Sequence, residues 1–269
     1  MSSGGYFSEV AEANATGMVA EIYQDIRSVM GVSVVNLVYR HLAVCPPVLE
    51  AVWTSVRPRF ADPSVIMRIG RTVRARPLGL SPWRASTKAL LGVDEAWERG
   101  LRDTVALYNY ANALNLTMVE WALESGSADA PGEDVAQAPP MVLDPGKLML
   151  LPMRRLDGLD PTMLDIMDEI ATTLGPDREV TVVPSLFRHF VDRPAYLAAA
   201  WAVIRVLVVG DRFEAERIRL RRAAGTILSD VPSLRLGPSD RDFLREISGF
   251  RYLVPSMLFV GGALAEMCG

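Results

Sequence analysis

Apolar residues recur along the chain at the three- and four-residue spacings of amphipathic helices. Over residues 18–30, Ile22, Ile26 and Val29 fall on one face, and Gly31 follows as a helix terminator. The same periodicity predicts further helices over residues 48–56, 94–102, 104–124 and 163–174 and from about Asp240 onward. No segment alternates apolar and polar residues in the manner of a strand, so the pattern predicts an all-α protein.

The helical pattern occurs twice. Segment 35–42, Val-Asn-Leu-Val-Tyr-Arg-His-Leu, is echoed by segment 183–190, Val-Pro-Ser-Leu-Phe-Arg-His-Phe. The echo continues at a spacing of 148 residues through Pro46 and Pro194, Leu49 and Leu197, Ala51 and Ala199, and Trp53 and Trp201. Upstream, Ile22, Ile26 and Gly31 match Ile166, Ile170 and Gly175, and downstream Tyr110 and Asn112 align with Tyr252 and Val254. Three matched blocks in the same order indicate a tandem duplication.

The duplication sets the expected domain organisation. It predicts a first helical repeat over 1–125, a linker rich in proline, glycine and alanine over 126–150, and a second repeat over 151–269. We expect the two helical-bundle repeats to form an intramolecular pseudo-dimer. Because symmetry brings equivalent faces together, the interface between the repeats is the natural place for a pocket.

Composition narrows the classes of function. The formal net charge is −4 and there is no long basic run, which gives no reason to expect binding to nucleic acid or to a membrane surface. Two cysteines and two histidines in 269 residues argue against a Cys/His metal site or a disulfide framework. No phosphate-binding loop or nucleophile elbow occurs, so we expect no cofactor. We expect a cytoplasmic protein that acts on a small molecule, with a homodimer as one option for its assembly.

Several segments in the same order resemble the group I 2-haloacid dehalogenase (DehI) family. They are Tyr6-Phe7, Glu21-Ile-Tyr-Gln-Asp-Ile-Arg, the stretch from Val32 through Arg40 and Pro46 to Trp53, and Leu107-Tyr-Asn-Tyr-Ala-Asn. The resemblance implies two helical repeats joined by a long linker, with an active site between them. It also implies hydrolysis of 2-haloacids of both configurations, in which an aspartate activates the attacking water, an asparagine assists and aromatic side chains shape the pocket.

Carried over residue by residue, the resemblance places the family's asparagine on Asn112 and the serine before its aspartate on Ser185. The aspartate itself falls on Leu186, and neighbouring residues 183–187 supply no acid. Three aromatic pocket residues fall on Val34, Leu37 and Val254. A leucine cannot accept a proton, and general-base catalysis supplies about 10²–10⁴ in rate, so the family's route cannot operate here in its usual form.

His189 is the first candidate to replace the missing base. If residues 185–190 are helical, positions 186 and 189 lie on one face, and imidazole has a pKa suited to proton transfer near neutral pH. His41 occupies the matching position of the first repeat. Either histidine can instead be a packing residue that hydrogen-bonds at a helix end. We favour this interpretation for His41, and for His189 we give the two interpretations equal weight.

Three further polar features have two interpretations each. Asn112 can orient a substrate or a water, or bridge two helices as a buried amide. Glu120, between Val119 and Trp121, can act as an acid or base with a raised pKa, or form an ion pair with an arginine. The arginine-rich run at 217–222 is typical of a solvated helix face, with a subsite for an acidic group as the alternative.

Three functions remain open from the sequence. The first is a diverged enzyme, independent of cofactors, that acts on a small or medium organic acid or a similar apolar substrate by displacement, cyclisation, elimination or isomerisation. The second is a non-catalytic protein that binds a small molecule in an inherited pocket lined by Val34, Leu37, Leu186 and Val254. The third is a haloacid dehalogenase, hence a hydrolase, that uses a different base.

Overall fold

Every regular element in the computed structural model is a helix within the described residues, which are 8–124, 148–175 and 182–269. The predicted linker lies outside these ranges except at its end. The first half contains η1 (Glu12–Asn14), α1 (Gly17–Met30), α2 (Leu37–Leu42), α3 (Pro46–Phe60), α4 (Pro63–Thr72), α5 (Ala85–Leu90) and α6 (Glu95–Glu124). The second contains α7 (Pro161–Leu174), η3 (Ser185–His189), α8 (Pro194–Leu207), α9 (Asp211–Gly225), α10 (Pro238–Arg245), η4 (Glu246–Gly249) and α11 (Phe250–Cys268). The prediction of an all-α fold is confirmed for this part of the chain.

Local sequence signals explain where α1 and α7 begin and end. Helix α1 ends at Gly31, whose φ of 63° places it in the left-handed region that glycine adopts without a steric penalty. Helix α7 begins at Pro161, and the side chain of Asp160 accepts a hydrogen bond of 2.9 Å from the backbone N–H of Thr162. Both helices therefore have the boundaries that their sequences predict.

Residues 94–102 and 104–124, predicted as separate helices, form the single helix α6. The polar residues at the expected break bind a neighbouring segment and do not cap a new helix. The carboxylate of Asp103 accepts a hydrogen bond of 2.8 Å from the N–H of Met149, and the Thr104 hydroxyl accepts one of 3.0 Å from the N–H of Leu151. Sequence alone did not show that the segment after the linker returns to this place.

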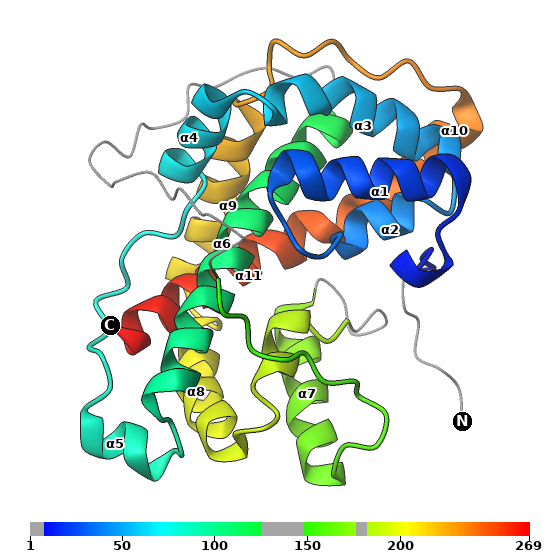
Figure 1. Ribbon diagram of the computed structural model, residues 1–269. Coiled ribbons are helices and arrows are strands. Elements are labelled where there is room, and N and C mark those ends of the chain that lie inside the picture. Colours follow the sequence, from blue (N-terminus) through cyan, green and yellow to red (C-terminus); the bar gives the residue numbers. More distant parts are fainter. Residues whose placement is uncertain (1–7, 125–147, 176–181) are drawn as a thin grey trace.

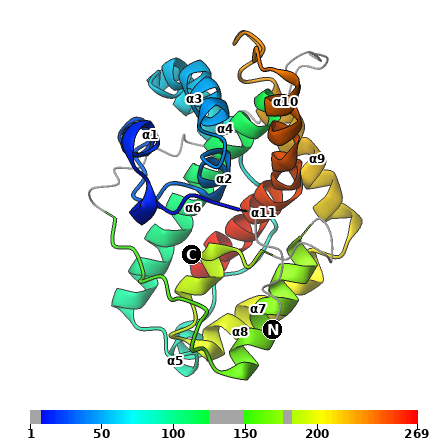
Figure 2. The same cartoon turned by 90° about the vertical axis from the view of Figure 1, so that its right-hand side faces the viewer.

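The buried apolar residues form two clusters, one in each of two lobes (Figure 1). The α1 lobe contains helices α1 to α4 and α10, and the α7 lobe contains α7, η3 and α8. Figure 2 shows the same separation after a quarter turn. Helices α6, α9 and α11 contribute to both clusters, so each core draws on both halves of the chain.

Helices α6 and α11 cross between the lobes in opposite directions. Helix α6 starts in the α7 lobe and ends in the α1 lobe, whereas α11 starts in the α1 lobe and ends in the α7 lobe. They approach closely at Gly261, where an added Cβ would lie 1.8 Å from the Asn109 side-chain oxygen. Glycine at this position leaves room for the Asn109 side chain between the two helices, which a larger residue would displace.

The arginine-rich run at 217–222 is a solvated face only in part: Arg222 is exposed, whereas Arg217, Arg219 and Arg221 are half-buried. The Arg219 guanidinium pairs with Glu216 at 2.7 Å, and the Arg221 Nε donates to Glu120 at 2.8 Å. Leu220 between them is fully buried. Because α9 packs against α6, this part of the helix meets protein, and the charges of Arg219 and Arg221 are neutralised by the buried carboxylates of Glu216 and Glu120.

The run Pro238–Cys268, which contains α10, η4 and α11, is long and apolar enough to cross a membrane. However, 72% of its most apolar window is buried inside the protein. Such burial is typical of a core helix in a globular fold, so length and composition are weak evidence for a membrane span here.

Candidate functional site

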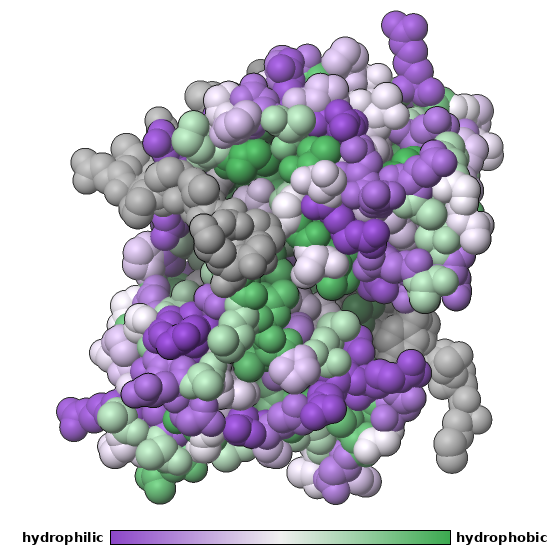
Figure 3. Space-filling view, in the orientation of Figure 1, coloured by the Kyte–Doolittle hydropathy of each residue, from purple (hydrophilic) through white to green (hydrophobic). Residues whose placement is uncertain are grey.

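A cavity of about 390 Å³ lies between the lobes, beside the crossing of α6 and α11. Its size falls within the range of small-molecule sites. Seven of the predicted site residues line it, namely Val34, Leu37, Asn112, Ser185, Leu186, His189 and Val254. Apolar side chains also gather on the surface between the lobes on the face that Figure 3 shows. The fold therefore brings together, from distant segments, most of the residues that the resemblance singled out.

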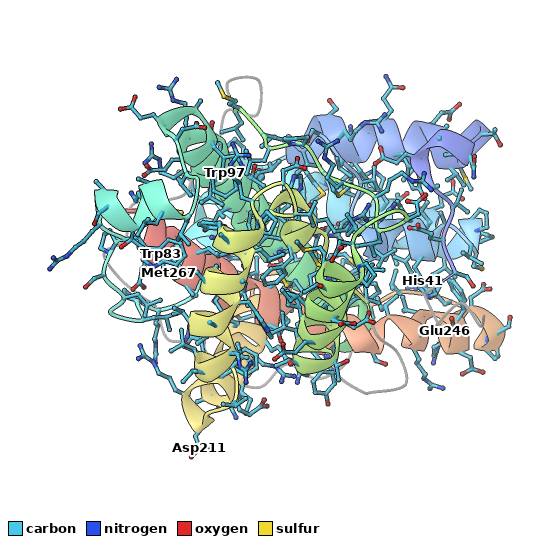
Figure 4. All side chains as sticks on the ribbon, turned by 90° about the horizontal axis from the view of Figure 1, so that it is seen from below. His41, Trp83, Trp97, Asp211, Glu246 and Met267 are labelled. Atoms are coloured by element: carbon cyan, nitrogen blue, oxygen red, sulfur yellow. The ribbon has the colours of Figure 1, made fainter. Side chains whose placement is uncertain are left out.

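His41 and Glu120 are not among the residues that line this cavity. The His41 ring stacks on Phe243, and its Nε2 lies 3.4 Å from a carboxylate oxygen of Glu246 (Figure 4). Glu120 has a side chain that is 1% exposed and forms ion pairs with Arg221 and Arg251. The structure therefore assigns both residues to packing and ion pairing within the α1 lobe, and gives Glu120 the arginine-paired alternative considered above.

His189 ends the short helix η3 and lies on the cavity wall. Its Nδ1 is 2.7 Å from the backbone carbonyl oxygen of Leu151, which can only accept, so Nδ1 carries the proton. Burial lowers the pKa of His189 and the Arg188 charge acts in the same direction, while hydrogen bonds to the backbone of Leu151 and Pro152 oppose the shift. The ring is therefore neutral at neutral pH, and its Nε2 is a proton acceptor.

Tyr108 connects His189 to Ser185. The Tyr108 hydroxyl on α6 lies 3.1 Å from His189 Nε2 and 3.1 Å from Ser185 Oγ, and all three residues line the cavity. Burial raises the pKa of Tyr108, although the hydrogen bond with Ser185 and the charges of Arg188 and Arg40 act in the opposite direction. A protonated Tyr108 donates its single hydroxyl proton to Nε2, which leaves its oxygen free to accept from Ser185. The three side chains therefore form a continuous hydrogen-bonded array in the cavity wall.

Asn112 lies one helical turn beyond Tyr108, on the same face of α6. It is 5% exposed and lines the cavity, and within the described ranges its carboxamide forms no hydrogen bond. A buried amide costs free energy unless it has a partner, so this group is available to a bound molecule or water. Leu186, fully buried, contributes only an aliphatic surface to the opposite wall.

Charges at the cavity are few. Of the lining residues in the described chain, Glu9 is the only carboxylate, and it forms an ion pair of 3.1 Å with Arg40. Arg188 is the other cationic residue that lines the cavity. With the carboxylate engaged by an arginine, His189 is the lining group best placed to accept a proton.

Metal ligands do not gather in the described part of the chain, where no three His, Cys, Asp or Glu side chains are arranged to hold an ion. The two cysteines also lie apart from the cavity lining. Burial raises the pKa of the Cys268 thiol to about 11, so this thiol stays protonated at neutral pH.

Among the cavity residues that were not singled out from the sequence, four carry ionisable side chains: Glu9, Arg40, Tyr108 and Arg188. For Tyr108 a signal existed, because it precedes Asn112 by four residues and so shares its helix face. Arg40 and Arg188 directly precede the two histidines, but adjacent residues on a helix do not face the same way. Glu9 gave no signal, since only the tertiary fold brings the segment before α1 to the cavity.

The described chain has the fold of D-2-haloacid dehalogenases. It superimposes on a D-2-haloacid dehalogenase in complex with L-LA with a TM-score of 0.79 and 17% sequence identity, covering 98% of this chain and 96% of the other. A mutant of a D-2-haloacid dehalogenase gives 0.78 at 18% identity, and a mutant complex with D-2-CPA gives 0.74 at 17%, with the same coverage. No family model matches the sequence, and no curated protein is similar to it. At this identity the likeness shows the fold alone.

Proposed function

We propose that this protein is a diverged member of the DehI-like group, an enzyme that acts on a small or medium organic acid in the cavity between two duplicated helical repeats. The observation that carries this proposal is the hydrogen-bonded array of Ser185, Tyr108 and His189 in the cavity wall. It supplies a neutral imidazole whose acceptor nitrogen is connected to the cavity through the Tyr108 hydroxyl, and a neutral imidazole is the requirement for a general base near neutral pH.

Two parallel contacts support descent from a duplicated unit. The N–H of Val10 donates to the carbonyl of Arg40 at 2.9 Å, and the N–H of Arg154 donates to the carbonyl of Arg188 at 3.2 Å. In each half the following histidine hydrogen-bonds through Nδ1 to a carbonyl of the same extended segment, Ser8 for His41 and Leu151 for His189. Duplication explains why an intramolecular pseudo-dimer would place its cavity between the halves.

The reaction that we propose does not use an aspartate at position 186. Leu186 has no ionisable group, so proton transfer passes to His189 through Tyr108. In this scheme a water or substrate hydroxyl beside Ser185 loses its proton along the array, and the resulting imidazolium keeps its Nδ1–H on the Leu151 carbonyl. Asn112 offers its carboxamide to the substrate. Displacement, cyclisation, elimination and isomerisation are all compatible with such a base.

The assay that tests this proposal combines halide release from both enantiomers of 2-chloro- and 2-bromopropionate with NMR detection of conversion in a panel of organic acids. We expect His189→Ala and Asn112→Ala to abolish conversion while their far-ultraviolet circular dichroism remains that of the natural protein. Normal turnover in both variants would remove the proposal.

The first alternative is a hydrolytic dehalogenase that uses another base. The ion-paired Glu9 is the observation in its favour, because it is the carboxylate at the cavity wall. Halide release that is lost in Glu9→Gln but retained in His189→Ala would select this alternative. If the natural protein is silent and Leu186→Asp releases halide, the cavity is an inherited one whose original chemistry has been lost, and the substrate must be sought among other acids.

The second alternative is a binding protein without catalysis, which the aliphatic lining at Val34, Leu37, Leu186 and Val254 favours. Saturable binding of panel members that are recovered unchanged, with no dependence of any conversion on His189, would select it.

A further inference from the structure

The two cationic residues of the cavity, Arg40 and Arg188, occupy equivalent places. Each precedes a buried histidine, and the carbonyl oxygen of each accepts a hydrogen bond from an extended segment, through the N–H of Val10 and of Arg154 respectively. Both side chains line the same cavity. Their surroundings nevertheless differ, and the difference indicates where an anion would bind.

Among the described residues, Arg40 has a counter-ion and Arg188 does not. Glu9, the residue before Val10, forms the ion pair with Arg40. In the other half the residue before Arg154 is Met153, which also lines the cavity. The residue at this position is thus an acidic one, Glu9, beside Arg40, and an apolar one, Met153, beside Arg188. Arg188 forms no ion pair with a carboxylate in the part of the chain that the structure describes; its charge reaches Asp157, but that carboxylate is paired with Arg155 at 2.8 Å.

The Arg188 guanidinium is also oriented in advance. Its Nε donates a hydrogen bond of 2.8 Å to the carbonyl oxygen of Arg154, and within the described ranges its two terminal nitrogens have no hydrogen-bond partner. Neighbouring Arg154 is already engaged by Asp192 at 2.9 Å. A positive charge with free donors at the edge of an apolar cavity favours a planar anion that can accept two hydrogen bonds.

We propose that Arg188 binds the carboxylate of the acid that enters the cavity, with the apolar body of that acid against Leu186, Val254 and Met257. This assignment rests on the proposed function only in treating the bound acid as a substrate. A carboxylate suits the site because a single unpaired guanidinium balances one negative charge. Since Arg188 and His189 line the same cavity and the Arg188 charge acts on the His189 ring, this placement holds the carbon atoms next to the carboxylate near the array of Ser185, Tyr108 and His189.

Isothermal titration calorimetry with octanoate and octanamide tests the assignment, because the two probes share their apolar chain and differ in charge. We expect the natural protein to prefer octanoate. In Arg188→Gln the affinity for octanoate should fall roughly ten- to a hundredfold, the loss typical of a charge-assisted hydrogen bond, while that for octanamide stays unchanged. Arg205→Gln is the matched control, since Arg205 on α8 pairs with Glu169 and does not line the cavity.

Equal affinity of the natural protein for acid and amide, or no binding of either at millimolar concentration, overturns the assignment without any variant. Preference for the acid that persists in Arg188→Gln also overturns it. If Arg188→Gln does not fold, Arg188→Lys is the second variant, because it keeps the positive charge and should retain part of the preference for octanoate. Complete loss of that preference in a folded Arg188→Lys overturns the role of the charge. Acid preference that depends on Arg188 in a protein that converts no acid leaves this assignment standing and removes only the proposed catalysis.

Discussion

His41 and His189 stand at matching positions of the two halves, and each is buried, 2% and 8% exposed respectively. Each hydrogen-bonds through Nδ1 to a backbone carbonyl, at 2.8 Å from Ser8 and 2.7 Å from Leu151. The Nδ1 atoms of the two rings therefore have the same kind of partner. In each half, a hydrogen bond to the backbone of a preceding segment fixes how the ring is oriented.

The Nε2 sides of the two rings differ. His41 meets Phe243 and the carboxylate of Glu246, which fill the space around it. His189 meets the hydroxyl of Tyr108 and a cavity. The cause is the arrangement of the helices that follow: α10 and η4 cover the His41 ring, whereas α6 presents Tyr108 to His189 and leaves room beside it. Equivalent residues can thus be a packing group in one lobe and a candidate base in the other.

The largest expected effect is a loss of kcat when His189 is replaced but not when His41 is replaced. His189→Asn keeps a donor for the Leu151 carbonyl but removes Nε2, so kcat should fall by about 10²–10⁴, the usual contribution of a general base. His41→Asn should retain kcat, because His41 does not line the cavity. The measurement is steady-state consumption of an acid converted by the natural protein, with the folded fraction of each variant determined by circular dichroism. Equal losses in both variants would contradict the contrast between the two sites.

A smaller effect is expected from Tyr108→Phe, which removes the hydroxyl that faces His189 Nε2. Turnover should fall by about tenfold, because the base remains and a water in the vacated space can replace the hydroxyl in the transfer to Nε2, with poorer positioning. The pKa of His189 should rise, because a hydrogen bond donated to the neutral ring opposes its protonation. Titration of the imidazole signals by NMR measures that shift.

Tyr110→Phe is the matched control for this change. Tyr110 lies on the same helix but does not line the cavity, so both turnover and the His189 titration should match the natural protein. An unchanged His189 pKa in Tyr108→Phe would show that the contact across 3.1 Å does not hold the neutral ring in solution.

The smallest expected effect concerns stability and pH. Because the pKa of His189 is lowered from 6.5 in the folded protein, the unfolded chain takes up a proton first as the pH falls. The free energy of unfolding should therefore decrease as the pH is lowered below 6.5 and level off below the native pKa. Urea denaturation at a series of pH values measures it. The decrease should be smaller in His189→Asn, and identical pH dependence in the two proteins would contradict a neutral buried ring.

Much of the fold followed from local signals in the sequence. The helical period, Gly31 after α1 and the Asp160-Pro161 pair before α7 are short-range features, and each acts through contacts within a few residues. The prediction of a helix break near Asp103 was wrong because of a long-range contact. The Asp103 carboxylate accepts a hydrogen bond from the backbone N–H of Met149, which lies beyond the linker in the chain. A contact between segments so distant in the chain leaves no local pattern.

The sequence by itself determined the helical class, the similarity between segments 35–42 and 183–190 that pairs the two histidines, and the absence of an acid at position 186, because periodicity and residue identity are properties of the chain. Only the tertiary structure decided which of these residues share a cavity. It placed Tyr108 between Ser185 and His189, paired Glu120 with arginines and, within the described ranges, left Arg188 without a carboxylate in an ion pair. The physical reason is that burial, pairing and the pKa of a group depend on what the other helices bring to it, and the crossing of α6 and α11 sets that environment.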